Sequence, residues 1–394
     1  MKEYLFILGN AHQLAAFELK KILEQKIAFT DFSLEENLAT IKSAEPERKI
    51  AGLLKILGGT IKIGQLIERG DSREIIKNSL TNNPVRNFGV SCYRGNMPKS
   101  ALFSLKKELS SRGIKLRFVS GREAVLNAAE ILSNRLYATG REFIIVGDQV
   151  YRGLAVQNIK EATDRDYGKP RSDPKSGMLP PKLARMIVNI ALTEISREEC
   201  LVFDPFCGSG NLLLEALILN QAVAGCDLSD RAVADSQENL NWAVKKFGSD
   251  KKNIIKISVA DSRKDKFFVG IGDFKSLAIV SEPFLGAPRK EPYAPSNLKP
   301  VLANLSRLYL DFFENLSRQI INLDLKSIVV ALVFPLFEQS SGAPISLFSS
   351  LVDKIASLGY IKVASPFTYG RDYQVVKREI VLFKITAIKL KPVV

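Results

Sequence analysis

The feature that most constrains the fold is a regular alternation of short apolar runs and longer amphipathic stretches after residue 200. Near-continuous apolar runs are typical of strands buried on both faces of a parallel sheet, with helices as the crossovers between them. This pattern predicts a doubly wound α/β domain. Its strands and helices are expected, in chain order, at residues 200–204, 211–219, 222–227, 231–247, 253–261, 276–281, 300–321, 327–334 and 345–359.

Two further runs close the chain, at residues 360–367 and 375–385, and a polar stretch separates them. Because the second run alternates apolar and polar side chains, a closing antiparallel hairpin fits better than another crossover. The domain as a whole is predicted over residues 179–394, and its first helix begins with prolines, which the first turn tolerates. Residues 161–178 before it hold few apolar side chains and predict a linker, or a loop that covers a site.

The first 160 residues mix short strands with amphipathic helices, which predicts two small α+β units over residues 1–60 and 61–160. A chain of 394 residues, 46% hydrophobic and 25% charged, is long enough to bury two or three cores of this size. In the second unit we expect a strand at 87–93, a helix with Ser100 as its N-cap, a helix over 122–136 and a strand pair over 141–159.

The formal net charge of +14 is concentrated toward the N-terminus, where residues 1–160 carry 25 Lys and Arg against 16 Asp and Glu. Such a surplus favours a phosphate-rich partner, because bound cations release counterions from nucleic acid. Exposed helix faces and loops would give the same density of charge. The side chains that we predict to bind nucleic acid are Arg86, Arg94, Lys99, Lys106, Lys107, Arg112, Lys115 and Arg117.

Several classes of protein are disfavoured by composition. The single histidine, His12, lies far in sequence from every loop that looks chemical, which argues against a Ser-His-Asp triad or a histidine metal site. The four cysteines form no C-x-x-C pair, so we expect neither a disulfide framework nor a zinc site. No apolar run is long enough to cross a bilayer. We therefore expect a cytoplasmic protein without a metal or a membrane partner, and the sequence leaves its oligomeric state open.

Residues 201–216, LVFDPFCGSGNLLLEA, join a buried strand to a helix through an acid and a tight turn that contains Gly208 and Gly210. Ligands of a doubly wound sheet bind beyond the carboxyl ends of its strands, and glycines let the backbone approach them closely. Leu213 stands where the dinucleotide pattern G-x-G-x-x-G has its third glycine, and the turn lacks the Lys of a phosphate loop. A dinucleotide or a nucleoside triphosphate is therefore a poor fit.

Three acids, Asp204, Asp227 and Asp261, end successive strands of the predicted sheet. A carboxylate before the glycine turn would repel a pyrophosphate but attract the sulfonium of a cationic cofactor. Asp227 is placed to bind a ribose diol and Asp261 to accept from an adenine amino group. Each acid alone would also serve as a helix N-cap. Together they favour S-adenosylmethionine over NAD, and the predicted cofactor-binding residues are Asp204, Pro205, Phe206, Cys207, Gly208, Ser209, Gly210, Asp227, Leu228, Asp261 and Ser262.

The segments DPFCGSGNLLLEA, GCDLS, VADS and IVSEPFLG resemble motifs of class I methyltransferases. With DYGKP, GMLPPKLARMIVNIAL and QVVKREIVLFKI, the chain more narrowly resembles the THUMP-domain tRNA guanine-N2 methyltransferase family. The resemblance implies a ferredoxin-like unit at 1–60, a THUMP RNA-binding domain at 61–160 and a Rossmann-like methyltransferase domain at 179–394. It also implies S-adenosylmethionine as methyl donor, tRNA or another structured RNA as partner, and a guanine amino group as acceptor.

Residues 281–284, Ser-Glu-Pro-Phe, follow the fourth strand, where amino-methyltransferases carry Asp/Asn-Pro-Pro-Tyr/Phe. Here Ser281 and Glu282 depart from that pattern, while Pro283 and Phe284 keep it. We predict all four as catalytic residues. Pro283 favours an extended residue before it, and the ring of Phe284 can stack on a flipped base. Either the Ser281 hydroxyl or the Glu282 carboxylate can accept a hydrogen of the amine.

Ser-Glu-Pro-Phe can also be a plain turn without a catalytic role. Two other interpretations of the function stay open at this point. The loop can have lost its activity, which would leave an RNA-binding protein with a methyltransferase fold. The same loop chemistry also serves N6-adenine methyltransferases that act on DNA or RNA.

Overall fold

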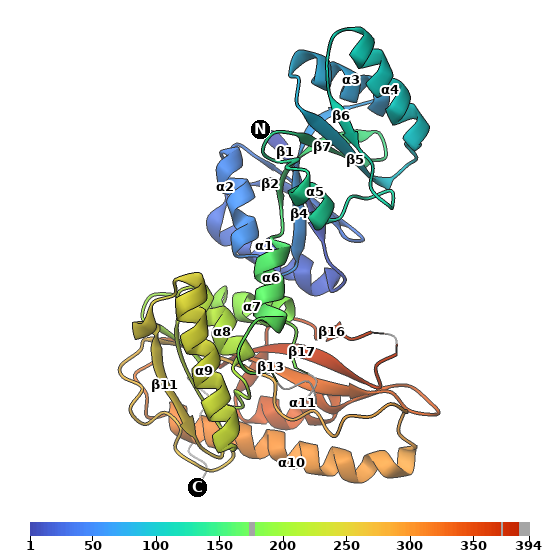
Figure 1. The fold of residues 1–394 in the computed structure, drawn as a ribbon. Helices are drawn as coiled ribbons and strands as arrows, with labels where there is room; N and C mark the ends of the chain where they lie inside the picture. The colour runs from blue at the N-terminus through green and yellow to red at the C-terminus, as the bar shows by residue number, and fades with distance from the viewer. Residues whose placement is uncertain (173–177, 372, 386–394) are drawn as a thin grey trace. The chain divides into compact units, whose positions relative to one another are not determined.

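The computed structural model describes residues 1–172, 178–371 and 373–385. It divides into two compact units, Met1–Ala162 and Thr163–Val394, each with its own sheet (Figure 1). No helix in the described part of the chain is long and apolar enough to span a membrane.

The first unit is an eight-stranded sheet with helices between its strands. Its elements are β1 (Lys2–Leu8), α1 (His12–Lys26), β2 (Thr30–Glu35), β3 (Leu38–Ser43), α2 (Glu47–Gly52), the 3₁₀ helix η1 (Leu53–Lys55), β4 (Thr60–Arg69), α3 (Ser72–Asn82), β5 (Asn87–Arg94), α4 (Lys99–Ser111), β6 (Arg117–Val119), α5 (Ala128–Ser133), β7 (Arg141–Val146) and β8 (Gln149–Val156).

The strand order of this sheet is β2-β3-β1-β4-β8-β7-β5-β6. β4 pairs with β1 on one side and with β8 on the other, antiparallel in both cases, so one sheet continues from the first strands to the last. The boundary that we predict between residues 60 and 61 falls at the start of β4. The two predicted units, ferredoxin-like and THUMP, thus correspond to parts of one continuous sheet, and their assignment stays a prediction.

The second unit starts within α6 (Ile159–Tyr167), which crosses the division. Its further elements are α7 (Pro181–Leu192), β9 (Cys200–Asp204), α8 (Asn211–Ile218), β10 (Ala222–Asp227), α9 (Asp230–Phe247), the 3₁₀ helix η2 (Lys251–Asn253), β11 (Ile254–Val259), β12 (Ser276–Ser281), α10 (Pro295–Ile320), β13 (Ser327–Phe337), β14 (Ile345–Ser346), α11 (Leu347–Ser357), β15 (Tyr360–Lys362), β16 (Phe367–Tyr369) and β17 (Val376–Ile385).

The strands of the second unit follow the order β11-β10-β9-β12-β13-β17-β15. The first five run parallel, β17 is antiparallel to β13, and both β15 and β16 are antiparallel to β17. The predicted doubly wound sheet with a closing antiparallel segment is confirmed. Because the order reverses between β9 and β12, the loops that follow these strands diverge and leave a crevice at the carboxyl edge of the sheet.

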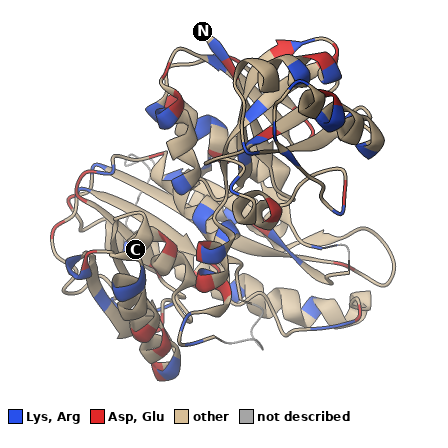
Figure 2. Cartoon of the chain, turned by 45° about the horizontal axis from the view of Figure 1, so that its top comes forward, with Lys and Arg blue, Asp and Glu red and all other residues tan. Residues whose placement is uncertain are grey.

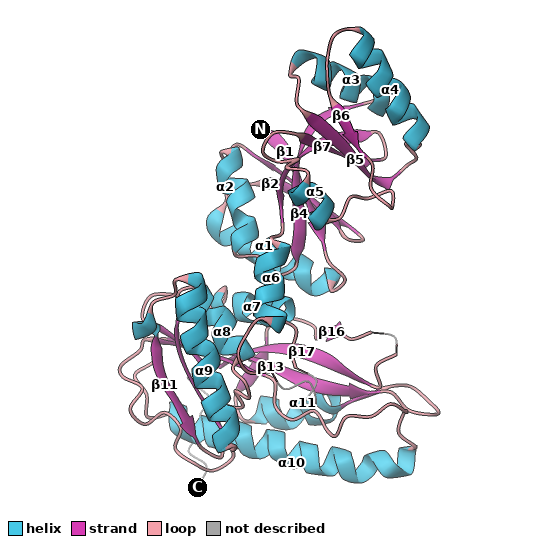
Figure 3. Cartoon of the chain, in the orientation of Figure 1, coloured by secondary structure: helices cyan, strands magenta, loops and turns pink. Residues whose placement is uncertain are grey.

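Helices cover both faces of this sheet, as Figure 3 shows. On one side α7 contacts β12 and β13, while α8 and α9 lie over β9, β10 and β11. On the other side α10 packs against α11, and α11 contacts β13 and β15. The core beneath α10 is aromatic: Phe313 meets Tyr360 and Phe383 edge to face, at centroid distances of 4.7 and 5.7 Å.

The helix predicted over residues 122–136 is wrong in its extent, because only α5 is helical there. The residues before α5 are held by β5 instead: the Cys92 amide donates to the Ala124 carbonyl, and the Leu126 amide donates to the Ser91 hydroxyl. A capping box between Asn127 and Glu130 then starts the helix. Tertiary hydrogen bonds thus override the helical pattern of this segment.

Three other details differ from the predictions. The predicted linker 161–178 is partly helical, since α6 extends through Tyr167, while residues 173–177 lie outside the described part. Helix α4 begins at Lys99 after Pro98, one residue before the predicted cap at Ser100. Strand β2 was not predicted, because its side chains are almost all exposed and show no apolar alternation.

Candidate functional site

A cavity of about 1160 Å³ opens at the carboxyl edge of the second sheet. Its walls come from the turn after β9, the ends of β10 and β12, the loop after β11 and the start of β17. These segments are far apart in the sequence, and the reversal of strand order brings them together. The predicted cofactor turn and the predicted catalytic loop therefore face one cavity.

The turn between β9 and α8 depends on two glycines with left-handed backbones, Gly208 at φ 51° and Gly210 at φ 82°. A Cβ on Gly210 would lie 2.5 Å from the Ser236 hydroxyl oxygen of α9, so no larger residue fits without a shift. Gly210 is also the N-cap residue of α8, and a glycine has no side chain that could accept from the first amides of the helix. The first amides of α8 thus remain available to a ligand in the cavity.

Asp204 ends β9 and lines the cavity, but only 2% of it is exposed. Its Oδ1 accepts a hydrogen bond of 3.0 Å from the Phe206 amide and another from the Ser281 hydroxyl. Burial raises the pKa of Asp204 to about 7, and the hydrogen bond from Ser281 opposes that rise. Because this carboxyl lies near its titration point at neutral pH, a nearby cation would favour its ionised form.

Asp227 ends β10 and is fixed by the backbone: one carboxylate oxygen accepts from the Gly208 amide at 2.9 Å and the other from the Ser229 amide at 3.0 Å. A carboxylate oxygen can accept a second hydrogen bond, so Asp227 keeps capacity for a hydroxyl of a ligand. It therefore couples the glycine turn to the end of the neighbouring strand. Leu228 beside it is 67% exposed and also lines the cavity.

Asp261 follows β11 and lines the same cavity, but Arg263 occupies both of its oxygens, at 2.8 and 2.7 Å. This guanidinium holds the pKa of Asp261 below its usual range. Ser262 does not face a ligand through its hydroxyl, which donates to the Pro205 carbonyl. Asp261 thus lies where it was predicted, with a charged partner that the sequence did not reveal.

The loop after β12 places the two candidate hydrogen-bond acceptors, Ser281 and Glu282, in different surroundings. Ser281 is fully buried and donates its hydroxyl to Asp204, inside the fold. Glu282 lines the cavity with its side chain 17% exposed, and it pairs with Arg378 of β17. Pro283 is buried, while Phe284 is 59% exposed at the cavity wall. The geometry therefore favours Glu282 over Ser281 as the group that meets a substrate.

Several residues of this site were not predicted. Met178, Leu179 and Asn211 line the cavity, and Lys169 donates to the Asn211 side chain at the start of α8. Arg378 comes from the last strand. The segments DYGKP, GMLPPK and QVVKREIVLFKI, which hold all of these except Asn211, carried a family resemblance in the sequence, but that resemblance assigned no role to single side chains.

A buried charge cluster supports the helix that follows the glycine turn. Glu215 of α8 pairs with Arg165 of α6 at 2.8 Å and with Arg185 of α7 at 2.6 Å. The three side chains are at most 6% exposed. Buried ions of this kind need their partners, because a single charge left alone would be costly. The cluster thus fixes α8, and with it the glycine turn, against α6 and α7.

The described residues contain no group of three or more His, Cys, Asp or Glu side chains that could hold a metal ion. The four cysteines are free thiols, and three of them are buried. Burial raises the pKa of Cys207 well above its usual value, which makes its thiol a poor nucleophile beside the cofactor turn.

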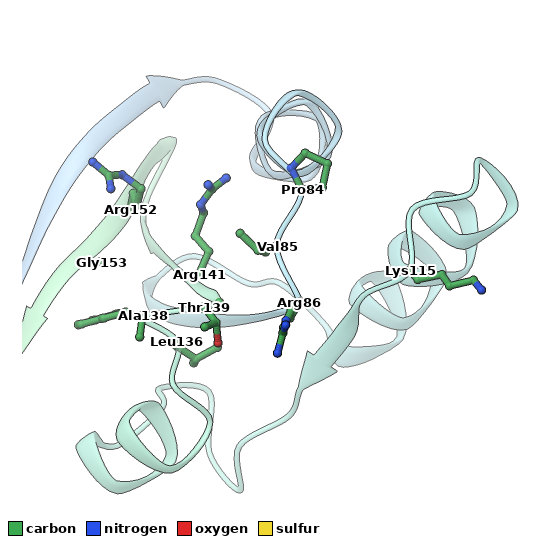
Figure 4. Close-up of a pocket in the computed structure, with 12 residues that line it drawn as sticks. Pro84, Val85, Arg86, Lys115, Leu136, Ala138, Thr139, Arg141, Arg152 and Gly153 are labelled. Atoms are coloured by element: carbon green, nitrogen blue, oxygen red, sulfur yellow. The ribbon is translucent and has the colours of Figure 1, made fainter.

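The predicted RNA-binding side chains lie in the first unit, and Lys and Arg are interspersed with acids over the whole chain (Figure 2). Two of them, Arg86 and Lys115, line a cavity of about 560 Å³ together with Arg141 and Arg152 (Figure 4). Within the described residues, neither Arg86 nor Lys115 has an ion-pair partner. We call these four residues the basic pocket.

The other predicted RNA-binding side chains are more dispersed, and several are engaged within the protein. Arg94 pairs with Glu35 and Glu36, and Arg112 pairs with Glu108 at 3.0 Å. Lys99 donates to the Gly121 carbonyl and Arg117 to the Asn134 side chain. Lys106 is half-buried and Lys107 exposed on α4.

The strand order, the glycine turn and the acids at the strand ends define the second unit as a Rossmann-like methyltransferase fold, as predicted. Residues 169–269 match the family model of the RMKL-like methyltransferase domain. A solved structure, SMU.472, which is named as a methyltransferase and is complexed with SAH, superposes with a TM-score of 0.51. It is 12% identical and covers 98% of this chain and 99% of its own, so the likeness concerns the fold.

Two curated relatives carry the name tRNA (guanine(10)-N2)-dimethyltransferase. The protein of Methanocaldococcus jannaschii is 32% identical over 137 residues, which are 33% of this chain and 37% of the relative. The protein of Pyrococcus abyssi is 31% identical over 127 residues, 32% of this chain and 35% of the relative. The matched region thus spans about a third of the length of these relatives, and the predicted resemblance to tRNA guanine-N2 methyltransferases is confirmed to that extent.

Proposed function

We propose that this chain is an S-adenosylmethionine-dependent methyltransferase that acts on the exocyclic amino group of a guanine in tRNA. One observation carries the proposal: a single cavity is lined by the glycine turn with Asp204 and by the Glu282 loop. A donor and an acceptor of a methyl group can meet there. The names of the curated relatives support the guanine amino group and the tRNA.

The residues of the cavity fit the cofactor. Gly208 lines the cavity and leaves open space where a Cβ would stand, Asp227 offers acceptor capacity to a ribose diol, and Asp204 places a titrating carboxyl at the cavity wall. When bound there, S-adenosylmethionine would supply a methyl group on a positively charged sulfur. The Asp204 carboxylate would compensate that positive charge, and Leu228 would provide an apolar wall.

The Glu282 loop fits the acceptor. An exocyclic amine on a base is a weak nucleophile because its lone pair is delocalised into the ring, so the enzyme must orient it and accept its hydrogens. The Glu282 carboxylate faces the cavity and can accept one hydrogen and then the proton that the nitrogen loses. The exposed ring of Phe284 would stack on the flipped base.

The first unit would bind the RNA. We keep residues 1–60 as a ferredoxin-like unit and 61–160 as a THUMP domain within this proposal. The basic pocket supports it, because four cationic side chains line it and, of these, Arg152 alone has an ion-pair partner among the described residues, Glu47 at 2.7 Å. A tRNA substrate would also place the protein in the cytoplasm.

The test is a cofactor titration followed by transfer of labelled methyl from S-adenosylmethionine to bulk tRNA. We expect both binding and incorporation. Binding of tRNA without incorporation would favour the silent RNA-binding protein instead. Incorporation into adenine rather than guanine would favour the N6-adenine methyltransferase.

A further inference from the structure

A bidentate ion pair lines the cavity of the proposed active site. Arg378 of β17 is 7% exposed, and its guanidinium reaches both oxygens of Glu282, from Nε to Oε2 at 3.1 Å and from Nη2 to Oε1 at 2.9 Å. Both residues line the cavity. The two positions are 96 residues apart in the chain, and the antiparallel closure of β17 on β13 brings them together.

This geometry has a chemical consequence for Glu282. A guanidinium that binds both carboxylate oxygens fixes the plane of the carboxylate and favours its ionised form. Each oxygen keeps one further lone pair, so the carboxylate can still accept a hydrogen from an amine in the cavity. The orientation of the Glu282 carboxylate as a hydrogen-bond acceptor is therefore fixed by Arg378, although Glu282 lies on a loop.

We propose that Arg378 is the positioning residue of this enzyme: it keeps the Glu282 carboxylate ionised and aimed at the substrate amine. The inference rests on the proposed function and deepens it. It also accounts for the departure of this loop from Asp/Asn-Pro-Pro-Tyr/Phe, because the acceptor moves by one residue and gains a cationic partner from the last strand. Arg378 would act through Glu282 and need not touch the base.

The surroundings of Glu282 determine the sign of the pH effect. Burial raises the pKa of Glu282, and Arg378 opposes that rise. The other ionisable groups near it are Asp204 at the end of β9 and Tyr309 on α10, neither of which is cationic. The further charged residues that line the cavity are Asp227, Asp261, Arg263, Arg289 and Lys290. Removal of the Arg378 charge should therefore raise the pKa of Glu282 further.

The first test is the pH profile of methyl transfer to tRNA for Arg378→Met, Arg378→Lys and Glu282→Gln. For Arg378→Met we expect the acid limb of kcat/KM to move up by about 1–3 pH units, with activity recovering at high pH. Arg378→Lys should show a smaller shift of the acid limb than Arg378→Met, because a lysine keeps the positive charge. Glu282→Gln should lose activity at every pH, since an amide cannot take the proton.

Lys377→Met is the matched control on the same strand, because Lys377 pairs with Glu338 at 2.8 Å and does not line the cavity. Its profile should match the wild type. If Arg378→Met lowers activity equally at all pH values, the residue has only a structural role and the proposal is overturned. The double variant Glu282→Gln/Arg378→Met, which leaves no buried charge alone, shows whether the site still folds.

A second measurement does not depend on activity. Carbon-13 NMR of protein labelled at the glutamate carboxyl carbon, with Glu282→Gln to assign the signal, follows the titration of Glu282 directly. We expect it to titrate at higher pH in Arg378→Met than in the wild type, with Arg378→Lys between them. An unchanged titration would refute the role of Arg378. A shifted titration in a protein that methylates no RNA would instead refute the proposed function alone.

Discussion

At the scale of single residues, Asp204 is the side chain whose charge depends most on its surroundings in the site. It ends a buried strand, accepts hydrogen bonds from Phe206 and Ser281, and has a pKa near 7 because burial disfavours its charge. A carboxyl in that state responds strongly to a cation, whereas an exposed carboxylate would already be ionised. The site can therefore bind a cationic methyl donor more tightly than the uncharged product that remains after methyl transfer.

The first prediction concerns the affinity of the site for S-adenosylmethionine as a function of pH. Because the ionised form of Asp204 binds the cation better, the affinity should rise between about pH 6 and pH 8, and binding should release a proton. S-adenosylhomocysteine lacks the sulfonium charge and should show a weaker dependence. Calorimetry in two buffers of different ionisation enthalpy measures both effects.

Asp204→Asn is the matched variant, because an amide keeps an oxygen that accepts from the Phe206 amide and the Ser281 hydroxyl. It should lose about tenfold or more in affinity for S-adenosylmethionine relative to S-adenosylhomocysteine, and the pH dependence should disappear. Equal affinity losses for the two ligands would show that Asp204 stabilises the fold of the site and does not interact with the positive charge of the donor.

The second prediction separates Ser281 from Glu282. Ser281→Ala removes the hydrogen bond that lowers the pKa of Asp204, so it should weaken cofactor binding near pH 7 while kcat at saturating cofactor stays within about tenfold. Glu282→Gln should instead reduce kcat by about a hundredfold or more. Steady-state kinetics with tRNA at saturating donor measures the split. The reverse pattern would return Ser281 to the role of acceptor.

Much of the site at this scale could be predicted from sequence, and the reason is local. Asp204 and Asp227 end apolar strands, and Gly208 and Gly210 follow a strand and open a helix, so spacing alone places them. The orientation of Ser281 and the partner of Glu282 depend on neighbours that are remote in the chain. Arg378 meets Glu282 only because β17 pairs antiparallel with β13, and no spacing rule specifies that register.

At the scale of elements, the start of α8 tests how the glycine turn shapes the cavity. Gly210 and Gly248 both have left-handed backbones, at φ 82° and 72°, and both lie at helix ends. A Cβ on Gly210 would collide with Ser236, whereas a Cβ on Gly248 meets no atom within 4 Å. The pair therefore separates backbone strain from loss of space.

The third prediction uses this pair. Gly248→Ala should reduce the free energy of unfolding by about 1–2 kcal/mol from the left-handed backbone alone. Gly210→Ala should cost a further 1–3 kcal/mol, roughly, from overpacking, and it should also weaken cofactor binding. Denaturant unfolding and a cofactor titration measure the two effects. A normal cofactor affinity in Gly210→Ala would mean that a shift of this turn against Ser236 does not reach the cofactor site.

The order of elements in the second unit follows from its sequence because each strand is a compact apolar run and each helix has one apolar face. Shorter or exposed elements escape such patterns. α5 has 6 residues, less than half of the predicted range 122–136, because hydrogen bonds to β5 hold the residues before it, and β2 lacks an apolar face. Residues 161–167 have few apolar side chains, yet α6 forms there around the buried ion pair of Arg165.

At the scale of the whole molecule, the net charge of +14 bears on the proposed binding of RNA rather than on the fold. The charge surplus of residues 1–160 was evident in the sequence, but its arrangement was not. Several of the predicted cations turn out to have partners within the protein, while Arg86 and Lys115 line the same cavity as Arg141 and Arg152.

The fourth prediction follows from that arrangement. Arg86→Glu/Lys115→Glu should weaken tRNA binding at least tenfold and reduce the slope of log K against log salt by roughly 0.7–0.9 for each lost phosphate contact. Lys245→Glu/Lys251→Glu in the second unit is the control with the same change of net charge. Filter binding over a range of salt concentrations measures both. Equal losses in the two variants would show that only the overall charge counts.

The central claim is methyl transfer from S-adenosylmethionine to a guanine amino group, with Glu282 as acceptor of the hydrogen. Nucleoside mass spectrometry of tRNA incubated with the purified protein and methyl-labelled donor tests it most directly. The account predicts labelled N2-methylated guanosine with the wild type and about a hundredfold less, or none, with Glu282→Gln over the same time. Label in adenosine, or equal N2-methylation by both proteins, would contradict it.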